Sequence, residues 1–199
     1  MSNLGQVTLN DCWISATILC FYMGLYHIPA VKIEGPKVSF PDGRSVILTE
    51  NLQCEIEIVM RASRVYFSEK SASISGVLGF PYLQKYLDLA KLNKTGCPDT
   101  ISKLFFGLNF KIYSTSFISF YPKTNIKNIE HMLRNRNPKE VFMMTFKFLP
   151  SHLYVYHDIS DLNILSLFDV SDSEIKQTNI STSNIAILFR LDLSSIQDM

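Results

Sequence analysis

The sequence of 199 residues predicts an α+β fold in which helices come first and strands follow. In the first half, apolar residues recur at helical spacing, as in "NLQCEIEIVMRASRV" at 51–65. The second half changes to β-branched and aromatic runs between short polar turns, such as "VFMMTFKFL" at 141–149. We therefore expect a single catalytic domain over 1–199, with a helical lobe over about 1–108 and a lobe formed by an antiparallel sheet or barrel over about 109–199.

The helical half is expected to open with a helix from about Cys12 to Leu25, capped by Asp11 or Asn10. The Pro-Asp-Gly sequence at 41–43 lies between two β-branched runs and indicates a hairpin within 31–49. Further helices are expected at 51–65, from Pro81 onward, and at about 98–107.

The second half contains one segment with helical periodicity, "IKNIEHMLRN" at 126–135. Its other apolar segments are rich in Val, Ile, Phe and Tyr, the residues that favour strands. Strands are accordingly expected at 110–120, 141–149, 152–160, 163–170 and 184–193.

The composition restricts the function classes. Apolar residues make up 47% of the chain and the net charge is +1, so we expect a folded globule that binds neither nucleic acid nor a membrane surface. The apolar run from Cys12 to Tyr26 is too short for a membrane span and lacks the basic start of a signal peptide. The four cysteines form no CxxC motif and the histidines show no metal-ligand spacing, so no metal or cofactor is expected. So few cysteines favour a reduced, cytosolic setting.

Cys12 is the candidate nucleophile. It lies at the start of the first predicted helix, where the partial positive charge of the helix favours the thiolate. The imidazole that would accept its proton must come from a distant histidine. His27 ends the same helix, and His131 is expected on a surface helix, which leaves His152 and His157.

The segment "HLYVYHDISDLNILSLFD" selects His152 over His157. It predicts a strand, a tight turn and an antiparallel return strand that brings Asp169 beside His152. A catalytic imidazole needs such a group to orient it. His157 is expected nearer the turn, beside Ser166 or Leu165, and on the opposite face of its strand.

These residues resemble the papain-like cysteine proteases. That family has a nucleophilic Cys followed by Trp or Tyr, with the His about 130–150 residues downstream. Here Cys12-Trp13 is followed by "SA", and His152 comes 140 residues after Cys12. The resemblance implies a two-lobe fold and a triad of Cys12, His152 and Asp169. It also implies an oxyanion donor six residues before the nucleophile, which is Gln6, although Asn10 is an alternative.

"NDCWISATILCF" is similar to the nucleophile helix of viral leader proteases, and the papain-like proteases of nidoviruses such as toroviruses are relatives of the same kind. "SGVLGFPYLQKYL" at 75–87 is similar to the loop and helix that border their substrate cleft. The resemblance implies an enzyme of the host cell cytoplasm that cleaves a viral polyprotein and also removes ubiquitin or ubiquitin-like modifiers. The expected substrate-binding residues are Trp13, Gly79, Phe80 and Ser151.

Two other functions remain open at this point. One is a different thiol chemistry on the same scaffold, such as an acyltransferase or an amidase. The other is a papain-like interaction domain that has lost catalytic activity. The reactivity of the Cys12 thiol would separate the second alternative from both enzymes.

Overall fold

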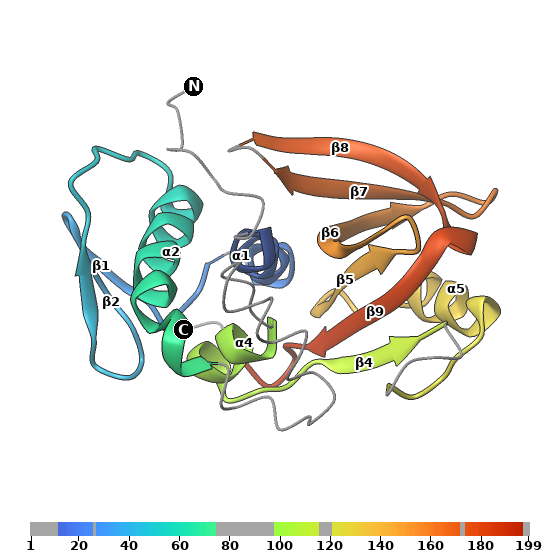
Figure 1. Ribbon diagram of the computed structural model, residues 1–199, viewed down its shortest axis with the longest axis horizontal. Coiled ribbons are helices and arrows are strands. Elements are labelled where there is room, and N and C mark those ends of the chain that lie inside the picture. The colour runs from blue at the N-terminus through green and yellow to red at the C-terminus, as the bar shows by residue number, and fades with distance from the viewer. Residues whose placement is uncertain (1–11, 26, 75–97, 116–120, 172–173, 197–199) are drawn as a thin grey trace.

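Figure 1 shows the computed structural model of the chain, which describes residues 12–25, 27–74, 98–115, 121–171 and 174–196. These residues form an α+β fold with two antiparallel sheets. None of the described helices is both long enough and apolar enough to cross a membrane.

Helix α1 (Cys12–Gly24) lies at the centre of the molecule and begins and ends close to where the sequence predicts. Every side chain from Trp13 to Phe21 is buried, as expected for a helix that is apolar on all sides. The hydroxyl of Thr17 donates to the carbonyl of Trp13 at 2.6 Å, which satisfies a polar group within the core. Figure 1 shows α1 almost end-on, between α2 (Glu55–Ile74) on one side and strands β5 (Glu140–Phe146) and β6 (Leu149–Ile159) on the other.

Helices α2 and α4 (Pro98–Phe106) pack against α1, and a small three-stranded sheet lies beyond α2 (Figure 1). The strands follow the order β1-β2-β3, and the predicted Pro-Asp-Gly turn joins β2 to β3. Gly43, with a φ of 82°, supplies the left-handed conformation of this turn. The elements are β1 (Lys32–Glu34), β2 (Lys37–Ser39), β3 (Ser45–Ile47), α2 (Glu55–Ile74) and α4 (Pro98–Phe106).

The second half forms a six-stranded sheet in the order β4-β9-β5-β6-β7-β8, in which all neighbouring strands are antiparallel. Helix α5 (Ile126–Arg134) precedes β5, and Asn125 caps it by accepting from the N–H of Asn128. The strands are β4 (Lys111–Ser114), β5 (Glu140–Phe146), β6 (Leu149–Ile159), β7 (Ile164–Ser171), β8 (Glu174–Ser181) and β9 (Ile185–Asp192). A short 3₁₀ turn (Thr182–Asn184) separates β8 from β9.

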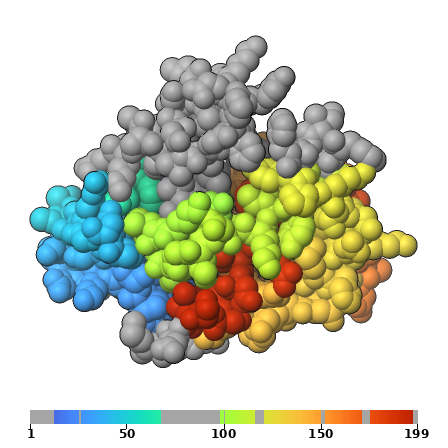
Figure 2. Space-filling model, turned by 90° about the horizontal axis from the view of Figure 1, so that it is seen from below, coloured from blue at the N-terminus to red at the C-terminus, as the bar shows by residue number. Residues whose placement is uncertain are grey.

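Each face of the six-stranded sheet buries its own core. On one face, Val141, Met143 and Val155 pack in the cluster that contains α1 and α2. On the other face, Phe142 and Met144 pack with residues of α5. Because both faces are covered, every residue of β5 is buried. Figure 2 shows the face of the molecule on which α4 adjoins the end of β9.

The structure adds two strands that the sequence analysis did not predict, β1 and β8, and it changes the limits of others. Strand β8 ("EIKQTNIS") is mostly polar and is the last strand at one edge of the sheet. Its described side chains are exposed or half-buried. Helix α2 begins at Glu55 rather than at 51 and continues to Ile74. The helix expected from Pro81 lies outside the described residues.

Candidate active site

His152 and Asp169 form a hydrogen-bonded pair. His152 Nε2 and Asp169 Oδ1 are 2.7 Å apart, and the imidazole is almost completely buried. The Asp169 side chain is 23% exposed, so one side of the carboxylate still meets solvent. The juxtaposition of these two residues, predicted from the hairpin alone, is therefore confirmed.

The hairpin of β6 and β7 produces this contact by its register. Asp169 lies directly opposite Tyr154, and its carboxylate reaches along β6 to the imidazole of His152. The pairing of β6 with β5 is interrupted between Met144 and Phe146, so that Phe146 pairs with Leu149. His152 therefore lies where β6 departs from regular pairing, and an irregularity of this kind redirects side chains.

Tyr154 is a part of this site that the sequence analysis missed. Its ring meets the His152 ring edge-on, with the centroids 4.7 Å apart. Two residues along a strand point to the same face, so the spacing from His152 was the signal that could have identified it. Tyr154 and Asp169 together fix the plane of the imidazole, which is what a base needs for directed proton transfer.

His157 lies apart from this pair. It is exposed, and its ring packs against Phe168 at a centroid distance of 5.0 Å. The expected pairing with Ser166 or Leu165 is wrong, because the register shifts between Tyr156 and Asp158 and leaves His157 in the irregularity. The expectation that His157 faces solvent is confirmed.

Cys12 is the first residue of α1, at the end where unpaired backbone N–H groups and the helix dipole favour an anion. The side chain of Cys12 lies outside the described atoms. The neighbouring Trp13 is 6% exposed and packs edge-on against Phe67 at 5.5 Å. Trp13 therefore belongs to the core between α1 and α2, and only a small edge of its ring is left for the substrate contact that we predicted.

The other expected site residues cannot be placed. Gln6, Asn10, Gly79 and Phe80 lie outside the described residues, and so does the side chain of Ser151. The roles that the sequence assigns to them stay predictions.

The remaining described cysteines have contrasting environments. Cys20 is fully buried in α1, and this burial raises the pKa of its thiol far above the ordinary value, although Arg136 lowers it slightly. Cys54 is exposed just before α2. A buried thiol with a raised pKa is inert, so Cys20 is unsuited to catalysis.

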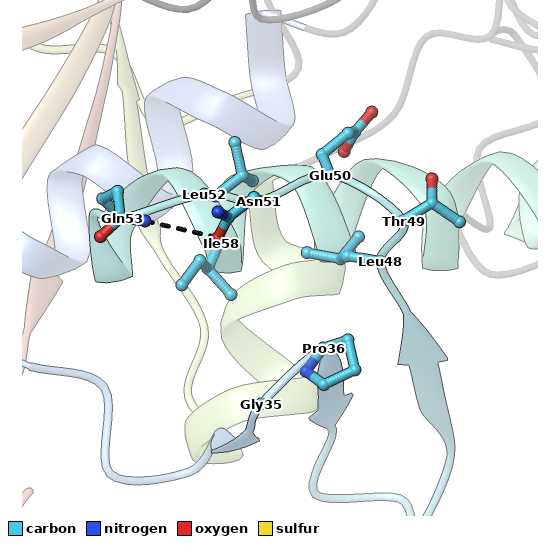
Figure 3. Close-up of a pocket in the computed structure, with 9 residues that line it drawn as sticks. All are labelled: Gly35, Pro36, Leu48, Thr49, Glu50, Asn51, Leu52, Gln53 and Ile58. Atoms are coloured by element: carbon cyan, nitrogen blue, oxygen red, sulfur yellow. Dashed lines mark hydrogen bonds between the residues drawn. The ribbon is translucent and has the colours of Figure 1, made fainter.

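A surface pocket lies at a different place. A pocket of about 520 Å³ lies between the β1–β2 turn and the segment that leads from β3 to α2, with Glu50 and Asn51 on its wall (Figure 3). Neither His152 nor Asp169 lines it. Catalytic chemistry needs reactive groups and not volume alone, so we place the candidate site at the His152–Asp169 pair.

The described residues contain no group of three or more His, Cys, Asp or Glu side chains that could hold a metal ion. What they do contain is a buried imidazole held by a carboxylate on the β6–β7 hairpin, and a helix α1 that begins with a cysteine. Comparisons with known proteins add no assignment to this geometry: no protein-family model, no curated protein and no solved structure matches the chain.

Proposed function

We propose that this protein is a cysteine endopeptidase with a papain-like two-lobe fold and a triad of Cys12, His152 and Asp169. The observation that carries the proposal is the 2.7 Å hydrogen bond between His152 and Asp169. A buried imidazole oriented by a carboxylate is the base–orienter half of a nucleophilic triad.

The packing of α1 supports Cys12 as the other half. The end of α1 lies on the start of β5, because a methyl group at Gly24 would come within 2.6 Å of Val141. At the opposite end, Trp13 shares a core cluster with Leu153, the neighbour of His152. The helix therefore packs on both β5 and β6. In the proposal, the irregular start of β6 turns the imidazole of His152 toward the end of α1 that carries Cys12.

The hydrogen bond also determines which ring nitrogen acts. Because Nε2 is bound to Asp169, the proton of the thiol would be taken up by Nδ1. The thiolate then attacks the scissile carbonyl carbon, and the imidazolium returns the proton to the leaving amine. Gln6 and the backbone N–H of Cys12 would stabilise the negative oxygen of the intermediate.

The substrate class follows from the resemblance to viral papain-like and leader proteases. We propose a viral polyprotein and the C-terminal tails of ubiquitin or ubiquitin-like proteins as substrates, encountered in the host cell cytoplasm. The chain requires no cofactor for this chemistry, because the thiol and imidazole supply both the nucleophile and the acid–base group.

A ubiquitin derivative with a C-terminal electrophile tests the proposal. We expect a covalent adduct on Cys12, located by mass spectrometry of the digested protein. Cys12→Ala should form no adduct, and Cys20→Ala is the matched control that should still react. If the folded wild-type protein cleaves viral Gly-Gly peptides but does not react with the probe, the protease assignment stands. Ubiquitin is then excluded as a substrate.

The two other functions predict different reactivities of Cys12, and two further measurements distinguish them. A thiol acyltransferase or amidase would form a stable acyl-enzyme on Cys12 with small acyl donors and would not cleave peptides. An inactive interaction domain would leave Cys12 no more reactive than Cys54, which is exposed and serves as the reference.

A further inference from the structure

A buried arginine lies against the first turn of α1. Arg64, in the middle of α2, is only 7% exposed. Its Nη2 and Nε atoms donate to the hydroxyl oxygen of Ser15 at 2.5 and 3.1 Å. Ser15 itself is fully buried, so the contact between the guanidinium and this hydroxyl is shielded from water.

The position of Ser15 places this cation close to the candidate nucleophile. Ser15 follows Cys12 by three residues in α1, and side chains at this spacing lie on the same side of a helix about 5–6 Å apart. The contact between Trp13 and Phe67 holds the same two helices together one residue from Cys12. The guanidinium therefore lies beside the first turn of α1, at the end that carries the partial positive charge of the helix.

Arg64 brings a positive charge into direct contact with α1 through Ser15. Helix α1 carries no charged side chain between Cys12 and Gly24, and β3 carries none. The neighbouring hairpin carries Lys37, Asp42 and Arg44, and at the far end of α1 the hydroxyl of Tyr22 donates to Glu55 of α2. Within α2, Arg61 binds Glu50 at the surface. Asp42 accepts from Tyr66 at 2.5 Å.

A charge buried at this position is screened only weakly by water, so it acts more strongly on its neighbours than a charge on the surface would. We infer that Arg64 is a positioning residue that stabilises the thiolate form of Cys12 by adding a fixed, weakly screened positive charge to the start of α1. A nearby arginine is one of the environments that activates cysteine thiols. The inference rests on the proposed function, because it assigns Cys12 as the nucleophile.

The experiment is the rate of Cys12 alkylation by iodoacetamide between pH 6 and 9, followed by mass spectrometry with Cys54 as the internal reference. Arg64→Met should slow Cys12 alkylation about tenfold at pH 6 and leave it nearly unchanged at pH 9, where the thiol ionises without help. Arg64→Lys, which keeps the charge, should retain the wild-type rate to within about threefold. Arg61→Met removes a surface arginine from the same helix and should change nothing.

Ser15→Ala provides a milder variant if Arg64→Met does not fold. It releases the guanidinium from its anchor and should slow Cys12 alkylation about threefold at pH 6, with Cys54 unaffected. A lower melting temperature with an unchanged pH profile in both variants would show a purely structural arginine and overturn the inference. A wild-type profile in which Cys12 behaves like Cys54 would instead refute the proposed function, so the two failures are distinguishable.

Discussion

At the scale of single residues, the hydrogen bond between His152 and Asp169 does two things. It holds the imidazole in one orientation, and it leaves Nδ1 as the nitrogen that would exchange a proton with the thiol in the proposed mechanism. The edge-on contact with Tyr154 limits rotation of the same ring. His157, only five residues along the strand, has neither partner and packs on Phe168 at the surface.

Substitution of the two histidines tests this difference. His152→Ala should be inactive in peptide cleavage, with a loss of about 10³-fold or more, because the base is removed. Asp169→Ala should be severely impaired, since the ring loses the group that orients it. His157→Ala is the matched control and should keep most activity. The measurement is kcat/KM with a fluorogenic peptide; equal losses in the two histidine variants would contradict the assignment.

The buried thiol of Cys20 predicts a dependence of stability on alkaline pH. Burial raises its pKa in the folded state, whereas in the unfolded chain the thiol has an ordinary pKa of about 8.5. Above that pH the unfolded state loses a proton that the folded state keeps. The free energy of unfolding should therefore fall by about 1.4 kcal/mol per pH unit from this group alone. Urea unfolding at pH 8 and pH 10 measures it.

Cys20→Ala is the control for this effect. The variant should be less stable at every pH, because it leaves a cavity in the core, but it should lose less stability between pH 8 and pH 10 than the wild type does. The same pH dependence in both proteins would show that the thiol of Cys20 makes no contribution.

At the scale of elements, α1 is the part of the fold that the sequence predicts best. Its apolar run, followed by Pro29 soon after the last helical residue, predicts a buried helix of about the observed length. The hairpin at Pro41-Asp42-Gly43 was equally predictable, because turn chemistry acts locally. Strand β8 was missed for the opposite reason: its polar residues gain strand geometry only by pairing with β7 across the edge of the sheet.

The end of α1 provides a test of how this helix packs on the sheet. Gly24→Ala should lower the free energy of unfolding by about 1–3 kcal/mol, because the added methyl group would meet Val141 at 2.6 Å and Leu193 at 2.9 Å. Thermal or urea unfolding measures the change.

Val141→Ala in the same chain removes one of the two clashing side chains. The double variant should therefore be less destabilised than the sum of the single variants. Strict additivity would contradict the proposed contact between α1 and the start of β5.

At the scale of the whole molecule, the site depends on the way in which the two halves of the chain meet. The pairing of His152 with Asp169 was predictable, because a hairpin brings together residues that are near in sequence. The burial of Trp13 was not predictable, because it depends on Phe67 in α2. Arg64 gave no sequence signal at all, since nothing local distinguishes a buried arginine from one on the surface of a helix.

The central claim is that the two halves bring Cys12 of α1 and His152 of β6 into one reactive pair. The pH dependence of Cys12 alkylation in the wild type and in His152→Ala tests this most directly. An ordinary thiol reacts about tenfold more slowly for each pH unit below its pKa. We predict that wild-type Cys12 stays reactive down to about pH 6, and that His152→Ala makes its rate fall as steeply as that of Cys54. A wild-type Cys12 that follows Cys54, or a profile that His152→Ala leaves unchanged, would contradict the claim.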